Sequence, residues 1–160
     1  MKPSNEWDEN DVLQLIESLV EENIQLDYKA SASLQKTDEK KKEISKDVSA
    51  FANSVGGTIV YGVAQYADAN RRRFPERIDG GCDPVEISKE WLEQVINSRI
   101  QPRIEGIRIH PIQLERTAPG KVIYTVSIPE SFTAHQASDH RYYRRYNFES
   151  VPMEDYARCD

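Results

Sequence analysis

The sequence predicts an α+β domain in which a small mixed or antiparallel sheet is packed by helices. Apolar residues recur at helical spacing in some segments and at every second position in others, so both kinds of element are expected. These elements follow one another without the strict alternation that a parallel βαβ sheet requires. The chain has 160 residues and is 38% hydrophobic, which is enough for one domain with its own core.

The start of the chain predicts a helix followed by a strand. Residues 1–7 are expected to be a disordered start, and residues 8–160 to form the single domain. A helix from Asp8 to about Glu22 is predicted by apolar residues at helical spacing, with acids in its first turn where the helix dipole favours them. The segment from Ile24 to Ala30 alternates apolar and polar residues, which is typical of a strand.

The segment from Lys46 to Val63 reads KDVSAFANSVGGTIVYGV and predicts a helix joined tightly to a strand. Gly56 and Gly57 follow the last apolar position of the helix and can take the left-handed conformation that ends it. The run TIVY that follows is β-branched and aromatic, as in a buried strand. Asn53, just before the glycines, is interpreted as a structural residue that bonds the backbone of the preceding strand. One face of the helix is apolar and comprises Ile44, Val48, Phe51, Ala52 and Val55.

The second half of the chain predicts one helix and further strands. Residues 64–82 show no regular pattern. Asp83 and Pro84 favour a helix start, and Pro102 ends the helix. Alternating apolar residues on either side of a turn at residues 117–120 predict a hairpin, in which Pro111 marks a bulge or an edge position. Another short strand is expected at residues 141–146.

Composition narrows the functional classes. The net charge of −6 argues against binding nucleic acid by bulk attraction. Eight acids and one lysine give residues 1–27 a charge of −7, which leaves +1 for the rest of the chain, so any cationic surface is local. No apolar run is long enough for a membrane helix, so no membrane partner is expected. The cysteines, Cys82 and Cys159, form no metal-type cluster and fit a reduced, cytoplasmic setting.

Four segments, taken in order, resemble the Schlafen AlbA-type domain family. This resemblance implies the same α+β fold, and it favours the N-terminal module of a longer protein. Animal members of the family are nucleases, whereas bacterial and archaeal members are regulators. The segments are LDYKAS from residue 26, the block at residues 46–63, WLEQVINSRIQPRIEGIRI from residue 91 and HQASDHRYYRRYNFESVPM from residue 135.

The resemblance makes a carboxylate cluster the first candidate site. Glu22 and Asp27 match two of the three acids that hold a divalent metal in the family's nucleases, where the metal activates water for phosphodiester cleavage. The third acid is absent because Ala64-Gln65 stands where the nuclease pattern has acids, and Asp68 is the nearest substitute. Mg²⁺ or Mn²⁺ would be the cofactor of such a site. The alternative is structural, with Glu22 on a solvated helix and Asp27 paired to Lys29 or to a neighbouring strand.

The second candidate is a basic and aromatic surface. In an extended strand from Arg141 to Tyr146, side chains alternate between two faces, so arginines and tyrosines occur on both. Arginine can bind phosphate while tyrosine stacks on a base. The alternative is a half-buried strand whose tyrosines enter the core and whose arginines pair with the acidic first helix. The candidate binding residues are Lys29, Arg71, Arg72, Arg73, Arg141, Tyr143, Arg144 and Arg145.

Three functions remain open from the sequence. The first is a nucleic-acid-binding module, for DNA or RNA, of a prokaryotic-type regulator or defence protein, which needs no cofactor. The second is a metal-dependent endoribonuclease that uses Glu22 and Asp27 with Asp68 or with an acid from a second subunit. The third is an oligomerisation domain, in which the acidic helix and the hydrophobic hairpin hold a homo-oligomer together. The missing third acid favours binding over cleavage.

Overall fold

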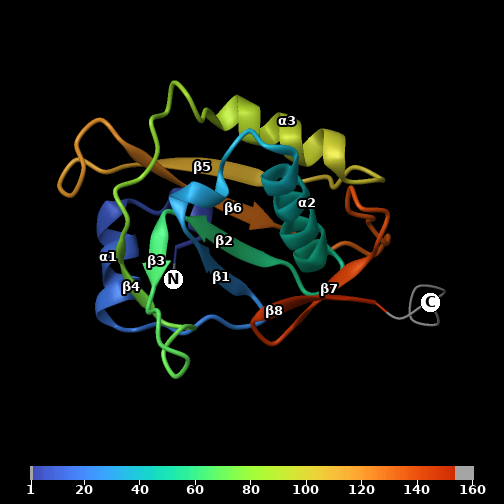
Figure 1. The fold of residues 1–160 in the computed structure, drawn as a ribbon, viewed down its shortest axis with the longest axis horizontal. Coiled ribbons are helices and arrows are strands. Elements are labelled where there is room, and N and C mark those ends of the chain that lie inside the picture. The colour runs from blue at the N-terminus through green and yellow to red at the C-terminus, as the bar shows by residue number, and fades with distance from the viewer. Residues whose placement is uncertain (1, 154–160) are drawn as a thin grey trace.

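The computed structural model describes residues 2–153 and has an α+β architecture built on a four-stranded mixed sheet. The strand order is β1-β2-β6-β5, with β1 parallel to β2 and the other neighbours antiparallel (Figure 1). Two separate hairpins, β3–β4 and β7–β8, are added to this sheet. The sheet strands are β1 (Leu26–Lys29), β2 (Gly57–Tyr61), β5 (Arg108–Gln113) and β6 (Val122–Ile128). The hairpin strands are β3 (Val63–Gln65), β4 (Pro75–Ile78), β7 (Tyr143–Tyr146) and β8 (Glu149–Pro152).

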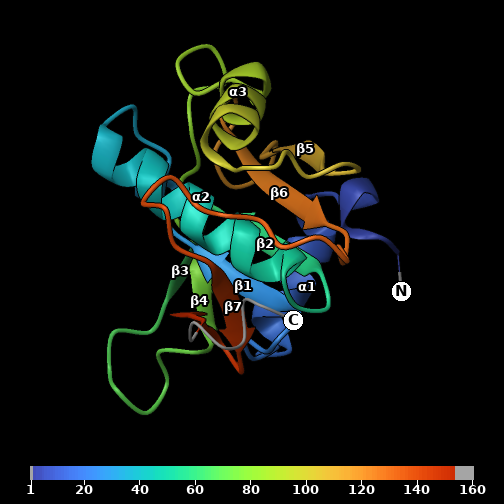
Figure 2. The same cartoon turned by 90° about the vertical axis from the view of Figure 1, so that its right-hand side faces the viewer.

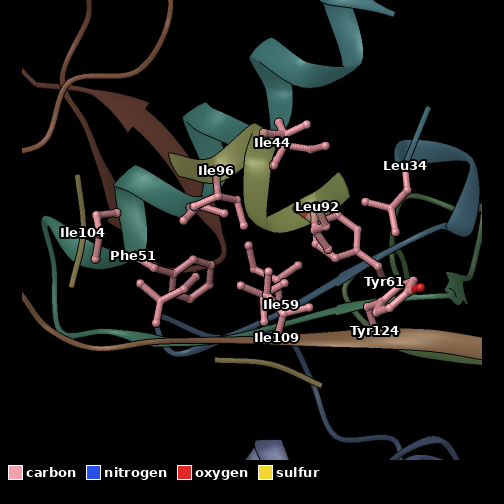
Figure 3. Close-up of a cluster of buried hydrophobic side chains, with 14 of the residues drawn as sticks. Leu34, Ile44, Phe51, Ile59, Tyr61, Leu92, Ile96, Ile104, Ile109 and Tyr124 are labelled. Atoms are coloured by element: carbon pink, nitrogen blue, oxygen red, sulfur yellow. The ribbon is translucent and has the colours of Figure 1, made fainter. Parts of the chain in front are cut away.

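Helices cover both faces of the sheet, as the side view shows (Figure 2). Helices α2 and α3 lie on one face, where they pack against alternate residues of β2 and β6 such as Ile59 and Tyr124 (Figure 3). Helix α1 lies on the other face, against residues that include Tyr28 and Val60. The helices are α1 (Glu9–Glu17), α2 (Asp38–Ala52) and α3 (Lys89–Arg99), with short 3-10 turns η1 (Ser4–Glu6) and η2 (Ser31–Ser33).

The alternation of side chains along β1 places charge in the interior. Leu26 and Tyr28 pack with α1, so Asp27 and Lys29 point to the face that α2 covers. The β7–β8 hairpin packs on α2 and closes the same region from outside. Figures 1 and 2 show both hairpins near the β1 end of the sheet.

The N-terminal region differs from the sequence prediction at two points. Residues 2–7, expected to be disordered, contain the turn η1, and both Ser4 and Trp7 are buried. Helix α1 ends at Glu17 rather than at Glu22, because Leu19 takes a left-handed conformation with φ of 51°. The Val20 N–H then bonds the Leu15 carbonyl at 3.0 Å, and the last turn is closed without a glycine. Glu22 therefore lies in the connection to β1.

The later elements also shift from their predicted bounds. Asp83 starts a tight turn by accepting the Val85 N–H, and α3 begins only after Ser88, whose hydroxyl caps it. The segment expected to be irregular forms the β3–β4 hairpin, whose register is interrupted between Ala64 and Gln65. The prediction for Pro111 is confirmed at the sheet edge, since β5 is the last strand and its ladder with β6 continues through that residue.

The glycine pair at the end of α2 has the expected role, although the helix stops earlier, at Ala52. Gly56 and Gly57 have φ of 75° and 152°, which only glycine adopts readily. Gly57 also passes so close to the preceding strand that a Cβ there would lie 2.5 Å from the carbonyl oxygen of Gln25. The pair thus allows β2 to begin directly beside β1. None of the helices within residues 2–153 combines the length and the apolarity that crossing a membrane requires.

We predict that Gly57→Ala destabilises the domain far more than Gly120→Ala does. Both glycines have positive φ, 152° and 86°, so each substitution loses about 1–2 kcal/mol from backbone conformation. Only at position 57 does the new methyl group also overlap the Gln25 backbone, whereas nothing lies within 4 Å at position 120. Urea denaturation of the two variants measures the difference. Equal losses of unfolding free energy would contradict the close approach of β2 to residue 25.

Candidate functional site

Glu22 and Asp27, two of the predicted acids, lie together in the interior. Glu22 is 9% exposed and Asp27 is 2% exposed. The Glu22 carboxyl accepts the Tyr28 N–H at 3.0 Å, and the Glu22 N–H donates to the carbonyl of Arg73 at 2.9 Å. Burial, followed by the hydrogen bond and the charge of Asp27, raises the pKa of Glu22 to about 9. Glu22 is therefore protonated at neutral pH, and Asp27 is the member of the pair that the cations Lys29 and Arg145 contact.

Lys29 and Asp47 extend this cluster toward α2. The Lys29 ammonium lies 3.5 Å from Asp27 and 3.7 Å from Asp47. Burial works to lower the pKa of Lys29, but the charges of Asp47 and Asp27 outweigh it and raise the pKa, so Lys29 stays charged. Burial raises the pKa of Asp47 to about 6, against the lowering effect of Lys29. Lys29 thus bridges two buried carboxylates.

Arg145 completes the cluster from the β7–β8 hairpin. It is 4% exposed, and its guanidinium lies 3.6 Å from the Asp27 carboxylate. It also donates to the Asn23 carbonyl at 3.0 Å and stacks on the Phe51 ring at 4.4 Å. This arginine belongs to the interior, so it is not part of the exposed surface that the sequence predicted. It pairs with a buried carboxylate of β1, whereas the alternative interpretation of the strand expected its arginines to pair with the acidic first helix.

The arrangement does not fit a divalent metal. Asp68, the substitute third acid, lies in the exposed β3–β4 connection, where Arg71 binds its carboxylate at 3.0 Å. Gln65 lies beside Glu22, and its amide opposes the rise in the Glu22 pKa. Across residues 2–153, no three acidic, histidine or cysteine side chains are grouped to hold a metal ion. The ammonium of Lys29 instead supplies the positive charge between Asp27 and Asp47.

The remaining basic candidates divide into free and paired side chains. Arg73 is bound to Glu21 at 2.9 Å and stacks on Phe148 at 5.0 Å, which joins the tips of the two hairpins. Arg72, Arg141 and Arg144 are exposed. Of these three, Arg72 and Arg144 have side chains without an ion pair or hydrogen bond within the part of the chain that the structure describes. The two hairpins therefore expose arginine side chains to solvent.

Tyr143 and Asn53 have structural roles on the inner side of the β7–β8 hairpin. Tyr143 is 5% exposed, its hydroxyl donates to Asp139, and the Lys46 ammonium lies 5.6 Å from its ring. Asn53 is structural as predicted, but its partners differ. Its side chain bonds the backbone of His135 and the carbonyl of Tyr143, rather than the β1 backbone.

Sequence reasoning missed Asp47 and the pairing of Arg145 with Asp27. A signal for Asp47 was present, because it falls between Ile44 and Val48 next to the apolar stripe of α2, where an acid needs a partner. The pairing of Arg145 had no local signal, because its partner lies at the other end of the chain.

The chain matches the model of one protein family. The profile described as "Schlafen, AlbA_2" matches residues 22–154. The chain belongs to the Schlafen AlbA_2 family. The match begins at Glu22, the first residue of the buried cluster, and runs past the end of the β7–β8 hairpin. No match was found among curated proteins.

Solved structures show the same fold at low sequence identity. The DIP2311 protein from Corynebacterium diphtheriae is similar with a TM-score of 0.59 and 16% identity, over 91% of this chain and 29% of that protein. The N-terminal domain of an ATP-dependent DNA helicase RecG-related protein from Nitrosomonas europaea is similar with a TM-score of 0.54 and 18% identity, over 96% of this chain and 86% of that one. The chain thus spans under a third of the Corynebacterium protein.

We predict that the domain loses stability between about pH 5 and about pH 9 because of Glu22. Its pKa is about 9 in the folded state and near 4.5 when unfolded, so the folded state holds the proton longer. The contribution of Glu22 to the unfolding free energy is complete below its pKa in the unfolded state. It is lost as the pH rises through its pKa in the folded state, by up to about 1.4 kcal/mol per pH unit. Glu22→Gln keeps an acceptor for the Tyr28 N–H and removes the titration. Across this range the unfolding free energy of wild type should therefore fall with pH more steeply than that of Glu22→Gln. Parallel plots of unfolding free energy against pH would show that Glu22 does not titrate this way.

We further predict that Arg145→Met destabilises the domain by about 3 kcal/mol, since it leaves the Asp27 carboxylate without its guanidinium partner. Adding Asp27→Asn should recover part of the loss, because the uncompensated charge is removed. Chemical denaturation of the single and double variants measures this coupling. A double variant less stable than the single one would contradict the pairing.

Proposed function

We propose that this domain binds nucleic acid through the backbone phosphates and does not cleave it. The observation that carries the proposal is the pair of hairpins, which Arg73 and Phe148 join and which expose Arg72 in the β3–β4 connection and Arg144 in β7, both side chains without acidic partners among the described residues. Free guanidinium groups match phosphate oxygens in geometry and charge. Aromatic side chains lie among them, with Tyr146 60% exposed and Phe148 partly exposed, and these can stack on bases.

Membership of the Schlafen AlbA_2 family supports the proposal, as does the likeness to a domain from a DNA helicase-related protein. Binding without cleavage is favoured by the cluster below the hairpins. Glu22 is protonated, Asp27 is paired with two cations, and an amide stands at position 65. A role in a regulator or defence protein fits a module of this kind.

The other two functions have less support. A nuclease would need a third carboxylate in place of Gln65, together with release of Lys29 from between Asp27 and Asp47. An oligomerisation domain built on the hydrophobic hairpin would need that hairpin to be accessible. Strand β6 is instead central and buried along almost its whole length.

We predict that oligonucleotide affinity falls steeply with salt, and that Arg72→Gln with Arg144→Gln reduces both the affinity and the salt dependence. Each lost phosphate contact lowers the slope of log affinity against log salt by about 0.7 for single strands and about 0.9 for duplexes. The double variant should therefore lower the slope by about 1.4 to 1.8. Fluorescence anisotropy at several salt concentrations measures it.

The matched control is Arg103→Gln with Arg108→Gln. Both of these arginines are exposed and have no ion pair within residues 2–153, and they lie near β5, the sheet edge opposite β1. The control changes the net charge equally and should leave binding nearly unchanged. Equal losses in both double variants would point to bulk charge and contradict a local surface. Cleavage by wild type with Mn²⁺ that is abolished in Asp27→Asn would contradict binding without catalysis.

A further inference from the structure

A cavity of about 420 Å³ lies beside β5, the edge of the sheet opposite β1. Its walls come from three parts of the chain: helix α3, the turn η1, and residues 103–110, which include the start of β5. Both α3 and η1 pack against β5, and Figure 1 shows α3 alongside that strand. None of the functions considered above uses this space.

Four polar side chains of the lining have no partner within the protein. They belong to Asn5, Asn97, Arg103 and Arg108, and none of them has a hydrogen bond or an ion pair within residues 2–153. Two guanidinium groups and two amides around one cavity leave its donors and acceptors to solvent or to a ligand.

The lining also carries a local excess of positive charge. Lys89 and Glu93 lie one turn apart on α3, with Nζ and Oε1 at 3.9 Å, so these two charges offset each other. Arg103 and Arg108 remain, which gives the lysine, arginine and acidic side chains of the lining a net charge of +2 in a chain whose net charge is −6. The cavity therefore attracts anions.

The wall formed by η1 is fixed to the sheet before any ligand arrives. The Thr125 hydroxyl donates to the carbonyl of Ser4 at 3.0 Å, and the His110 ring Nε2 lies 2.7 Å from the Trp7 carbonyl oxygen. These two contacts lie on either side of Asn5 in the sequence, so they hold its backbone against the sheet. A wall that is already ordered reduces the entropy that binding costs.

The size and the polarity of the cavity indicate a small hydrophilic ligand. Its 420 Å³ falls within the range of about 300–1,000 Å³ that is typical of small-molecule sites. Ile96, Ile104 and Ile109 contribute to the lining, but all three are buried and offer little apolar surface. An apolar molecule would therefore gain little by entering.

The two arginines favour a phosphate monoester over other anions. A guanidinium group binds phosphate or carboxylate oxygens in pairs. A phosphate monoester has three free oxygens and about −1.5 to −2 charges at pH 7, so one such group matches both Arg103 and Arg108. A carboxylate or a phosphodiester has one negative charge and leaves one guanidinium unmatched. The amides of Asn5 and Asn97 each offer donors and an acceptor, which suits hydroxyl groups on the rest of the molecule.

We propose that this cavity binds a small hydroxylated phosphate monoester, such as a sugar phosphate. Arg103 and Arg108 bind the phosphate group, and Asn5 and Asn97 bond the hydroxyl groups. The site is separate from the surface of the two hairpins and does not rest on the proposed nucleic-acid binding. Internal phosphates of a nucleic-acid backbone are diesters, which this site disfavours.

Calorimetric titration of the full chain with ribose 5-phosphate tests the proposal, with ribose and inorganic phosphate as comparison ligands. Wild type should bind ribose 5-phosphate more tightly than inorganic phosphate and should not bind ribose. Arg103→Gln with Arg108→Gln should weaken the binding of ribose 5-phosphate at least about tenfold, as for lost charged hydrogen bonds. The control, Arg72→Gln with Arg144→Gln, changes the net charge equally and should leave this affinity unchanged.

Asn97→Ala tests the part of the site that meets the hydroxyl groups. It should weaken the binding of ribose 5-phosphate about three- to tenfold and leave the binding of inorganic phosphate unchanged, because both guanidinium groups remain. Alanine is favourable within a helix, so the melting temperature should not fall. An equal loss for both ligands would contradict the contact between Asn97 and the hydroxyl groups.

The outcomes separate this inference from the proposed function. If wild type binds oligonucleotides but not ribose 5-phosphate, or if Arg103→Gln with Arg108→Gln binds it as wild type does, only this inference is wrong. Equal losses in the two double variants would indicate bulk charge and would also overturn it. If ribose 5-phosphate binds and oligonucleotides do not, only the proposed function is wrong.

The terminal phosphate of a strand is a second source of the same group. If a terminal phosphate raises oligonucleotide affinity through Arg103 and Arg108 while ribose 5-phosphate does not bind, the ligand is a strand end, and the proposal of a small molecule is wrong.

Discussion

The buried negative charge of Asp27 is the constraint on which the rest of the fold depends. A carboxylate in the interior is tolerated only when cations and hydrogen bonds surround it. Here the cations are Lys29, from the same strand, and Arg145, from the β7–β8 hairpin. The hairpin has only two strands, and an isolated pair of this kind is marginally stable. The need to neutralise Asp27 therefore helps to dock the hairpin on α2.

Because Asp27 must be neutralised, two neighbouring arginines of β7 have different structural roles. In β7, Arg145 points inward to Asp27 and Arg144 points outward to solvent, because successive side chains of a strand alternate. One short sequence thus supplies both the internal counter-charge and an exposed guanidinium, which the proposed function assigns to phosphate binding. This division leaves Arg144 exposed in a chain whose net charge is −6.

The sequence predicted much of the fold but only part of the site. Periodic patterns located α1, α2 and the β5–β6 hairpin, and the glycine pair located the entry into β2. The predicted end of α1 was too late in the chain. Leu19 adopts the left-handed conformation that glycine usually takes, and a leucine in the sequence gives no signal for it. Glu22 and Asp27 were found through the family resemblance. Their pairing with Arg145 could not be found, since it depends on how the hairpin docks, and neither sequence spacing nor residue type encodes that.

The position of Pro111 affects how copies of the domain can contact one another. The Leu114 N–H bonds the carbonyl of Lys121, so by alternation the backbone of Pro111 faces away from β6, at the open side of the sheet. Proline has no N–H to offer there, and an approaching strand would find a gap in the middle of the ladder. The exposed edge is a poor template for aggregation, so many copies can be held close together without their sheets fusing.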